Sequence, residues 1–248
     1  MLVSISCPLL FEPGTSWMYG NSLDWAGLLV MRVNSMSLEA YMQKYLWGPL
    51  SIQDITFHNN AKPDVRKKLV HMTKRGNGSV YGASVPSDEK VNWADESYHD
   101  GEDPDEFGGG GAFGSAVEYM KILHSICSDD GKLLKSETID EMFSPQLNSN
   151  AQNVLTQFRK IFTGSGNLEL GAQVDYGLGG LLISKDEGTD GKGGILRWSG
   201  RPNLYWMIDR VRGISTFYAS NIVPFGDAQS RKMQQLFEKE MYARISKM

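Results

Sequence analysis

Residues 11–21 read FEPGTSWMYGN, and they run directly into an apolar segment, Leu23–Met31. Asn21 and Ser22 are both favourable N-cap residues, so we expect a helix to begin here. A second informative stretch lies near the other end of the chain, where residues 198–203 read WSGRPN. Together, the two stretches indicate more about the fold and the site than any other part of the sequence.

The first half of the chain carries mainly helical patterns. Ser37 can cap a second helix, and the apolar residues behind it recur at the spacing of one buried helix face. These residues are Leu38, Tyr41, Met42, Tyr45 and Leu46. Ser115 and Glu118 have the spacing of a capping box, which predicts the start of a further helix, and Ser136 is expected to cap a shorter one. Residues 1–150 are therefore expected to be mainly helical.

From about Val174 the pattern changes to short apolar runs that are typical of strands. The expected strands are residues 176–184, 195–198, 204–208 and 214–219. Asp227 can cap a closing helix whose apolar residues fall on one face. They are Met233, Leu236, Phe237, Met241 and Ile245. A helical region, followed by an antiparallel sheet and a closing helix in residues 170–248, predicts an α+β fold.

The middle of the chain, residues 58–106, is polar and irregular. Nine acidic residues and a single lysine lie between Ser87 and Glu106, which indicates an exposed loop. Four glycines follow at residues 108–111, but no Gly-Lys-Ser or Gly-Lys-Thr comes after them. A phosphate-binding loop is therefore not indicated, and we expect these glycines to serve the geometry of the backbone.

Tyr19-Gly20-Asn21 and Trp198-Ser199-Gly200 resemble the second and third active-site motifs of the serine β-lactamase, penicillin-binding-protein and esterase superfamily. The match is best with the fungal esterase and transesterase branch. The pattern of this branch continues at Asn203, Trp206 and Asp209. The resemblance implies an α+β fold of the β-lactamase/transpeptidase type, in an incomplete form. It covers residues 1–248 as one partial β-lactamase-related domain, in which the N-terminal strands and the nucleophile helix are expected to be missing.

The resemblance also implies roles for the residues of these motifs. In the family a serine attacks an acyl carbonyl, and a serine hydroxyl is a poor nucleophile until a base removes its proton. Tyr19 matches the tyrosine base, whose pKa of about 10 a neighbouring lysine must lower. Asn21 matches the amide that orients this lysine and the substrate. The expected oxyanion and substrate-binding residues are Trp198, Ser199, Gly200 and Arg201. Among them, the Arg201 N–H matches one oxyanion donor, and Gly200 lets the strand approach the substrate closely.

Each motif also has a plain structural interpretation. Tyr19 alone is explained by a buried aromatic ring beside the start of a helix, with Asn21 merely as the cap. Residues 198–202 alone are explained by a strand end that is followed by a turn. The flanking residues 11–15 and Asp24-Trp25 match the family as well, and they favour the resemblance over these interpretations.

The first motif of the family, Ser-x-x-Lys, precedes the tyrosine motif, and residues 1–18 do not contain it. One Ser-x-x-Lys occurs at Ser87–Lys90, inside the acidic segment, where Asp88 and Glu89 work against a desolvated lysine. We interpret it as a chance match.

The sequence therefore predicts a truncated serine hydrolase or acyltransferase of the esterase or transesterase type. The complete form is expected to act on carboxylic esters or acyl thioesters through an acyl-serine intermediate. The alternative is a catalytically inactive remnant, or pseudoenzyme, that binds a small acyl ligand. Either form is expected to leave part of the core uncovered and one strand edge open.

The composition of the 248 residues, with 41% hydrophobic and 22% charged residues, is that of an ordinary globular protein. A net charge of −4 gives no electrostatic case for a nucleic-acid partner. No apolar run approaches the roughly 18 residues of a membrane span, and the start lacks the features of a secretory signal. We therefore expect a cytoplasmic protein with no membrane partner.

Cysteine and histidine usage gives no sign of a cofactor. Cys7 and Cys127 form no paired or clustered pattern, which fits a reducing compartment. The four histidines have no metal-ligand spacing, and no Gly-x-Ser-x-Gly elbow occurs. We expect no metal and no other cofactor. A small-molecule acyl substrate is the expected partner, and the oligomeric state stays open.

Two serines depart from the pattern of the family. Ser35 stands where its members usually have a helix-ending glycine, and Ser51 replaces the glycine of a Pro-Leu-Gly-Met segment. If both positions keep a positive φ, we expect each serine to cost about 1 kcal/mol of stability.

Overall fold

The computed structural model describes residues 8–78, 85–94, 105–161, 174–183 and 194–245. Cys7, His99 and Ser184 lie outside the described residues, as do part of the acidic segment and the first seven residues.

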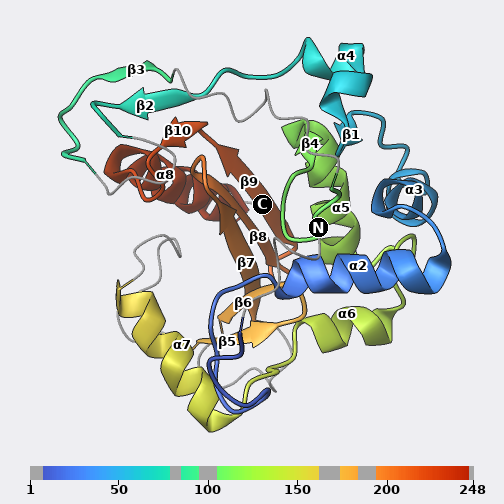
Figure 1. The fold of residues 1–248 in the computed structure, drawn as a ribbon. Helices are drawn as coiled ribbons and strands as arrows, with labels where there is room; N and C mark the ends of the chain where they lie inside the picture. Colours follow the sequence, from blue (N-terminus) through green and yellow to red (C-terminus); the bar gives the residue numbers. More distant parts are fainter. Residues whose placement is uncertain (1–7, 79–84, 95–104, 162–173, 184–193, 246–248) are drawn as a thin grey trace.

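A five-stranded antiparallel sheet forms the centre of the molecule (Figure 1). Its strands, in spatial and in sequence order, are β5 (Val174–Gly177), β6 (Gly180–Ile183), β7 (Ile195–Gly200), β8 (Leu204–Asp209) and β9 (Ile214–Ala219). The predicted antiparallel sheet is confirmed. The single strand expected over residues 176–184 was wrong, because Gly179 adopts a φ of 96° and turns the chain into a hairpin of β5 and β6.

Helices precede and follow the sheet, and the predicted α+β class is confirmed. They are α2 (Ser22–Asn34), α3 (Leu38–Met42), α4 (Pro63–Arg66), α5 (Ala116–Ser128), α6 (Ser136–Met142), α7 (Ser149–Ile161) and α8 (Ala228–Ile245). Two helical turns are η1 (Gln43–Trp47) and η2 (Asn59–Ala61). The short strands are β1 (Ile55–Thr56), β2 (Thr73–Arg75), β3 (Val91–Trp93), β4 (Phe113–Gly114) and β10 (Ile222–Val223). β1 pairs with β4, while β2 lies between β10 and β3.

The two faces of the central sheet are covered by different helices (Figure 1). On one face, Leu182, Leu196 and Ile208 pack in a cluster with residues of α5 and α6. On the other face lies α8, whose Tyr242 hydroxyl is 3.8 Å from the sulfur of Met207 on β8. Because side chains alternate along a strand, one sheet can serve both layers.

Sequence analysis did not predict α7 or the short strands. α7 is rich in Asn and Gln, and only a few apolar residues such as Leu155 reach the cluster formed with Val174 and Leu181. The short strands span two or three residues each, which is too few to show an alternating pattern. Both kinds of element depend on packing partners that are distant in sequence.

The prediction of an exposed loop ending at Glu106 was wrong for its last residue. Glu106 is only 7% exposed, and its carboxylate accepts hydrogen bonds from the Glu39 amide and the His58 ring. Acidic composition alone did not reveal these partners, because they come from segments far away in the chain.

Helix caps were predicted with mixed success. Ser37 and Ser115 accept hydrogen bonds from the amides three residues later, as expected, at 3.1 and 3.2 Å. Glu118 does not complete a capping box, because its carboxylate accepts from the Gln53 amide instead. The prediction that Ser136 caps α6 was also wrong, since Lys135 is the N-cap and the Ser136 hydroxyl donates to Asp129.

The orientation of α8 differs most from expectation. Its apolar residues do share one side, but Met233, Leu236, Phe237 and Ile245 are exposed. The residues buried against the sheet are polar: Ser230, Gln234 and Glu238. Glu238 pairs with the buried Arg197 of β7 at 3.2 Å, and the Ser230 hydroxyl lies 3.0 Å from that of Ser220. These polar partners on the sheet explain why the polar side of the helix faces inward.

Both edges of the central sheet, β5 and β9, stay unpaired among the strands that the structure describes. β9 is the last strand of the order, and it has a partner on one side only. A groove of about 430 Å³ lies where β9 begins, between α5 and the end of α8. Ile245 of α8 lines this groove, and α2 exposes Leu29 and Val33. The expectation that part of the core lies uncovered stays a prediction.

None of the helices described in the structure is long and apolar enough to cross a membrane.

Ser35 and Ser51 both adopt a φ of 52°, in the left-handed region that favours glycine. We therefore expect Ser35→Gly and Ser51→Gly each to raise the free energy of unfolding by about 1 kcal/mol, because glycine relieves the steric strain there. Denaturant unfolding of the three proteins measures this effect. The same exchange at Ser37, where φ is −65°, serves as the control, and should lower stability by a few tenths of a kcal/mol through loss of its cap. A stability loss at Ser35 and Ser51 alike would contradict the strain argument.

Candidate active site

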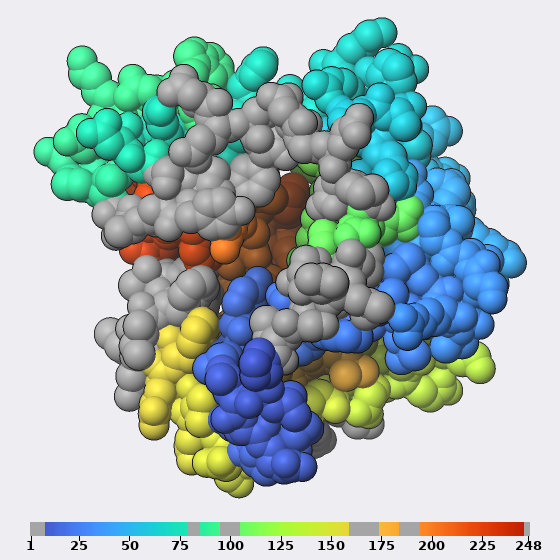
Figure 2. All heavy atoms as spheres, viewed as in Figure 1, coloured from blue at the N-terminus to red at the C-terminus, as the bar shows by residue number. Residues whose placement is uncertain are grey.

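The chain reaches the site through a turn that is tied to α7. The Thr15 amide donates to the Glu12 carbonyl at 3.1 Å, and Gly14 between them has a φ of 83°. Two asparagines at the start of α7 then hold this turn, with Asn148 donating to the Gly14 carbonyl and Asn150 to the Thr15 carbonyl. Figure 2 shows the blue N-terminal segment lying against the yellow α7. The segment that leads to the tyrosine motif is therefore held against the start of α7.

The structure brings the two predicted motifs together. The ring of Tyr19, immediately before α2, lies 5.8 Å from the ring of Trp198 on β7. Tyr19 is 56% exposed, so the alternative interpretation as a buried aromatic ring was wrong. An exposed tyrosine beside the end of a central strand is accessible to a ligand.

Asn21 occupies the N-cap position of α2, but its side chain makes no capping hydrogen bond. Its backbone carbonyl instead accepts from the amides of Asp24 and Trp25 at 3.1 Å each. The side chain is also exposed. The helix therefore does not use the Asn21 amide group, which leaves this group available to the site.

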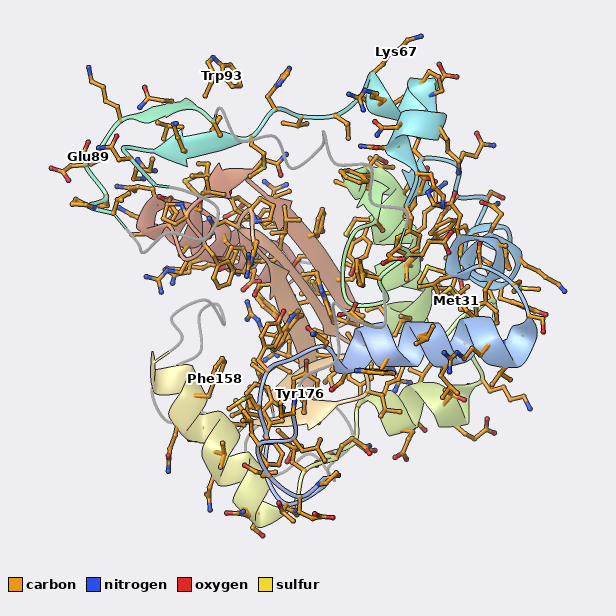
Figure 3. The ribbon with its side chains drawn as sticks, in the orientation of Figure 1. Met31, Lys67, Glu89, Trp93, Phe158 and Tyr176 are labelled. Carbon is orange, nitrogen blue, oxygen red and sulfur yellow. The ribbon has the colours of Figure 1, made fainter. Side chains whose placement is uncertain are left out.

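Aromatic rings extend from the two motifs toward α7. The ring of Tyr176 on β5 lies edge-on to that of Trp198, with ring centroids 5.5 Å apart. Its centroid lies 6.0 Å from that of the Trp17 ring. Trp17 in turn contacts Phe158 of α7 at 5.1 Å. Figure 3 labels Tyr176 and Phe158 on this side of the molecule. Burial raises the pKa of Tyr176 to about 12, and the nearby Tyr19 adds to the shift, so the phenol of Tyr176 stays neutral at physiological pH.

The end of β7 carries the other predicted residues. Trp198, Ser199 and Gly200 are half-buried at the end of the strand, and Arg201 is exposed in the turn that follows. A Cβ added at Gly200 would lie 3.4 Å from the Leu204 side chain, an ordinary contact. The fold itself therefore does not require glycine here, which fits a glycine needed for the approach of a ligand.

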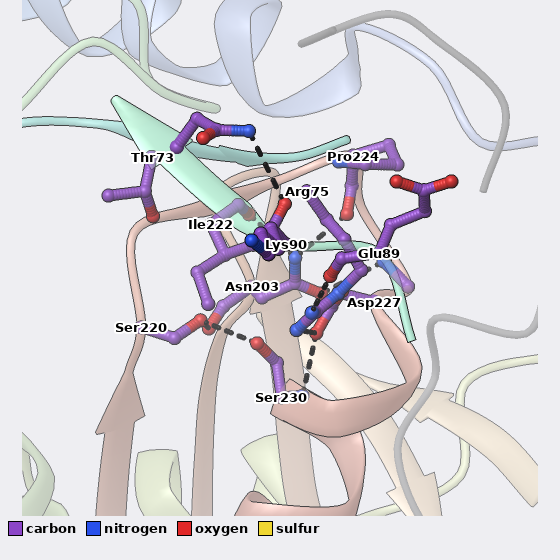
Figure 4. A network of polar contacts seen from close by, with 12 residues as sticks. Thr73, Arg75, Glu89, Lys90, Asn203, Ser220, Ile222, Pro224, Asp227 and Ser230 are labelled. Carbon is purple, nitrogen blue, oxygen red and sulfur yellow. Dashed lines mark hydrogen bonds and ion pairs between the residues drawn. The ribbon is translucent and has the colours of Figure 1, made fainter. Parts of the chain in front are cut away.

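The turn after β7 is anchored by Asn203, which is completely buried. Its amide nitrogen donates to the carbonyls of Ile222 and Pro224, which Figure 4 labels. Its oxygen accepts from the Tyr205 hydroxyl and the Gly226 amide. Asn203 also adopts a φ of 55°, which asparagine tolerates better than most residues. One side chain thus fixes the β7–β8 turn, and with it Gly200 and Arg201.

A buried ion pair lies next to this turn. The Arg75 guanidinium of β2 pairs with the carboxylate of Asp227, and the Ser230 amide donates to the same carboxylate at 2.8 Å (Figure 4). Asp227 thus caps α8, as predicted. Burial alone would raise its pKa, but hydrogen bonds from Arg75 and Ser230 outweigh burial and lower the pKa below its usual 3.8.

The chain can now be compared with known proteins. A family model described as Beta-lactamase matches residues 5–238. The chain belongs to the β-lactamase family.

Fungal acyltransferases and esterases are among its relatives. Monacolin J acid methylbutanoyltransferase of Aspergillus terreus is 32% identical over 241 residues, which cover 95% of this chain and 56% of the relative. Lovastatin esterase of Penicillium rubens is 33% identical over 252 residues, with 96% and 59% covered. A solved structure of simvastatin synthase (LovD) from Aspergillus terreus, the LovD6 mutant, superposes with a TM-score of 0.87 at 33% identity. It covers 98% of this chain and 58% of its own.

These comparisons confirm the predicted family, its fungal transferase branch and the β-lactamase/transpeptidase type of fold. The chain spans little more than half the length of these relatives.

Two of the glycines at residues 108–111, Gly108 and Gly109, lie against α2. A Cβ on Gly108 would come 2.2 Å from the Leu23 carbonyl oxygen, and Gly27 faces Gly108 across the contact. The Gly109 amide donates to Asp24 at 2.8 Å. This close approach fixes α2, the helix that begins directly after the Tyr19 motif.

The Ser-x-x-Lys at Ser87–Lys90 lies in the connection between β2 and β3, and no helix holds it. Its backbone is used structurally, because the Glu89 carbonyl accepts from Arg75 at 2.8 Å. Lys90 is exposed. The interpretation as a chance match agrees with this position.

Sequence analysis missed Tyr176 as a candidate site residue, and with it the two asparagines that hold the Gly14 turn. Tyr176 was expected only as part of a strand. Gly-Leu-Gly-Gly follows Tyr176 in the sequence, and this pattern predicts a turn but does not indicate a functional residue. Only the hairpin of β5 and β6 brings this ring to Trp198.

Proposed function

We propose that this chain supplies the tyrosine and oxyanion part of a serine acyl-transfer site of the esterase or transesterase type. The complete enzyme would act on carboxylic esters or acyl thioesters through an acyl-serine intermediate. The nucleophile would come from a Ser-x-x-Lys segment outside residues 1–248, so this chain would be a truncated form.

The observation that carries the proposal is the approach of Tyr19 to Trp198, with ring centroids 5.8 Å apart. Two motifs from opposite ends of the chain meet where Tyr19 is 56% exposed. The relatives named acyltransferase and esterase support the same class of reaction.

Each proposed residue has a part in this chemistry. Tyr19 would take the proton of the attacking serine and return it to the leaving group. Asn21, whose side chain α2 does not use, would orient the substrate or the lysine. The Arg201 N–H would stabilise the oxyanion, while Trp198, Ser199 and Gly200 would form the wall along which the acyl group lies.

The second candidate is an inactive remnant that binds a small acyl ligand. It is favoured by one specific observation. The Ser-x-x-Lys within this sequence lies at Ser87–Lys90, where no described helix could present its serine to Tyr19. A chain of this kind would bind acyl compounds at the aromatic surface without turning them over.

Tyr19→Phe tests the proposed function in the complete native polypeptide, whose extent is first determined by peptide mass spectrometry of the protein from its source. We expect peptides that contain a Ser-x-x-Lys ahead of the tyrosine motif. We expect hydrolysis of p-nitrophenyl butyrate to fall about 100-fold or more in Tyr19→Phe, because a general base contributes that much.

Tyr45→Phe is the matched control, since Tyr45 is exposed on η1 and belongs to neither motif. It should keep full activity. Acyl-ligand binding with no turnover, in a native polypeptide without the nucleophile, would support the remnant instead. Saturable hydrolysis that is equal in the wild type and Tyr19→Phe would rule out the proposed role of Tyr19.

We also propose a cytoplasmic location and a division of the partial domain into a mainly helical part, residues 1–150, and a sheet part with the closing helix, residues 170–248. The order of the described elements supports this division. A single free cysteine in the described residues, the buried Cys127, fits a reducing compartment. No nucleic-acid partner is proposed, because the net charge is −4.

A further inference from the structure

Three side chains with metal-ligating atoms meet beside the first turn of α3, and none of them belongs to the candidate active site. Glu39 comes from the first turn of α3, His58 from the end of the segment after β1, and Glu106 from the segment before the glycines. One ligand atom of each lies within 4.8 Å of the others. Ligand atoms at about 2.0–2.2 Å from a tetrahedral ion lie about 3.4 Å from one another, which is within this limit.

The two carboxylates are held in place by other groups. Glu39 Oε2 accepts from the Phe57 amide at 2.7 Å, and Glu106 Oε2 accepts from the Glu39 amide at 2.7 Å. Each carboxylate therefore has one oxygen that is held by a backbone amide. This is how outer partners orient the ligands of metal sites in proteins.

The Oε1 atom of each carboxylate has a cationic or titratable partner. That of Glu39 also accepts a hydrogen bond from the Thr56 hydroxyl. Glu106 Oε1 lies 2.8 Å from His58 Nε2, and Glu39 Oε1 lies 2.7 Å from the Lys62 ammonium. The side chains of Glu106 and Glu39 are 8% and 15% exposed, whereas those of His58 and Lys62 are 40% and 39% exposed. Glu106 is thus buried and Glu39 half-buried, whereas the side chains of His58 and Lys62 are more exposed to solvent.

The charge of the cluster is negative. Two carboxylates face one lysine, so the sum is −1 with a neutral His58. Burial alone would raise the pKa of Glu39, but hydrogen bonds from Lys62, Phe57 and Thr56 outweigh burial and lower the pKa below its usual 4.5.

We propose that Glu39, His58 and Glu106 bind a divalent transition-metal ion of the zinc class. One imidazole nitrogen with two carboxylate oxygens suits Zn²⁺, whereas Mg²⁺ and Ca²⁺ prefer oxygen ligands alone. Without the ion, the Lys62 ammonium neutralises Glu39. When the ion binds, the half-exposed Lys62 side chain moves away from this carboxylate. The ion ties α3 to Glu106, two residues ahead of the glycine that packs on α2.

Sequence patterns do not indicate this site, because its ligands come from three separate segments and have no motif spacing. The expectation that no metal binds rested on the lack of a cysteine cluster and of metal-ligand spacing among the histidines. A single histidine combined with two distant glutamates is not detectable in this way.

Isothermal titration of the purified chain with ZnCl₂ at pH 7.5 tests the proposal, with CoCl₂ as the spectroscopic probe. We expect one Zn²⁺ per chain, and a visible Co²⁺ spectrum of a low-coordinate site with a nitrogen ligand. His58→Gln and Glu106→Gln should each weaken binding at least tenfold. His124→Gln is the matched control, because His124 is exposed on α5 outside the cluster, and should bind as the wild type does.

Lys62→Met provides a second and opposite readout. It keeps all three ligands but removes the competing cation, so it should bind Zn²⁺ several-fold more tightly than the wild type. Lys68→Met, which removes an exposed lysine paired with Asp54, should leave binding unchanged. Absence of Zn²⁺ uptake in both the wild type and Lys62→Met would overturn the proposal, even if the His58 and Glu106 variants fail to fold. Uptake that persists equally in His58→Gln and Glu106→Gln would also overturn it.

Discussion

Asp227→Ala is expected to lower the free energy of unfolding by about 3–5 kcal/mol, because it leaves the buried guanidinium of Arg75 without its carboxylate. Arg75 is 6% exposed and cannot recover its hydration in the folded state. The variant also loses the N-cap of α8, since the Ser230 amide donates to Asp227. Urea or thermal unfolding followed by circular dichroism measures the loss.

Asp64→Ala is the control for this result. Asp64 pairs with Lys67 at 3.7 Å on the surface, where its side chain is 93% exposed, and its loss should cost less than about 1 kcal/mol. The double variant of Arg75→Met with Asp227→Ala should cost less than the two single changes added together, because no buried charge then stays unpaired. Additive losses would contradict an energetic coupling of the pair.

The same pair makes an acid-dependent contribution to stability. The pKa of Asp227 is lowered in the folded state, so its contribution is present above the usual pKa of 3.8 and is lost as the pH falls through the folded value. We expect the wild type to lose stability below about pH 4. The Asp227→Ala variant should lack this part of the acid dependence.

Asn203→Ala is the second change with a large expected effect, a loss of at least about 3 kcal/mol. It removes four hydrogen bonds from a completely buried position, and each buried group left without a partner costs about 1–3 kcal/mol. The carbonyls of Ile222 and Pro224 and the Gly226 amide are among these groups. Unfolding by urea, with the same readout, checks the prediction.

Asn221→Ala is the matched control, because Asn221 has nearly the same positive φ, 52° against 55°. Its side chain makes a single longer hydrogen bond, 3.4 Å to the Val70 carbonyl, and is partly exposed. The two variants therefore share the backbone strain and differ in the buried network. Equal losses would assign the effect to the backbone conformation and not to the network.

The sequence allowed prediction of the sheet and of the two motifs because both depend on local pattern. Apolar runs broken by turn residues predict an antiparallel sheet wherever the partners are consecutive, as β7, β8 and β9 are. Tyr19 and Trp198 were paired through resemblance to a family, since nothing in their spacing alone places them 5.8 Å apart.

The features that the sequence did not predict depend on contacts between distant segments. Tyr176 enters the site only through a hairpin whose turn is set by Gly179. Glu106 was assigned to an exposed loop because its partners, Glu39 and His58, belong to other segments. Helix periodicity, likewise, identifies an apolar side of α8 but not which side faces the sheet.

The inward polar side of α8 has a consequence for how stability should be measured. Gln234 is fully buried, yet neither polar atom of its side chain has a partner among the described residues, so this contact contributes little to holding the helix. The apolar side, with Met233 and Phe237, faces outward. A partner that covered this side would bind the folded form alone, and by mass action the melting temperature would then depend on its concentration. Melting temperatures of the variants should therefore be compared at one protein concentration.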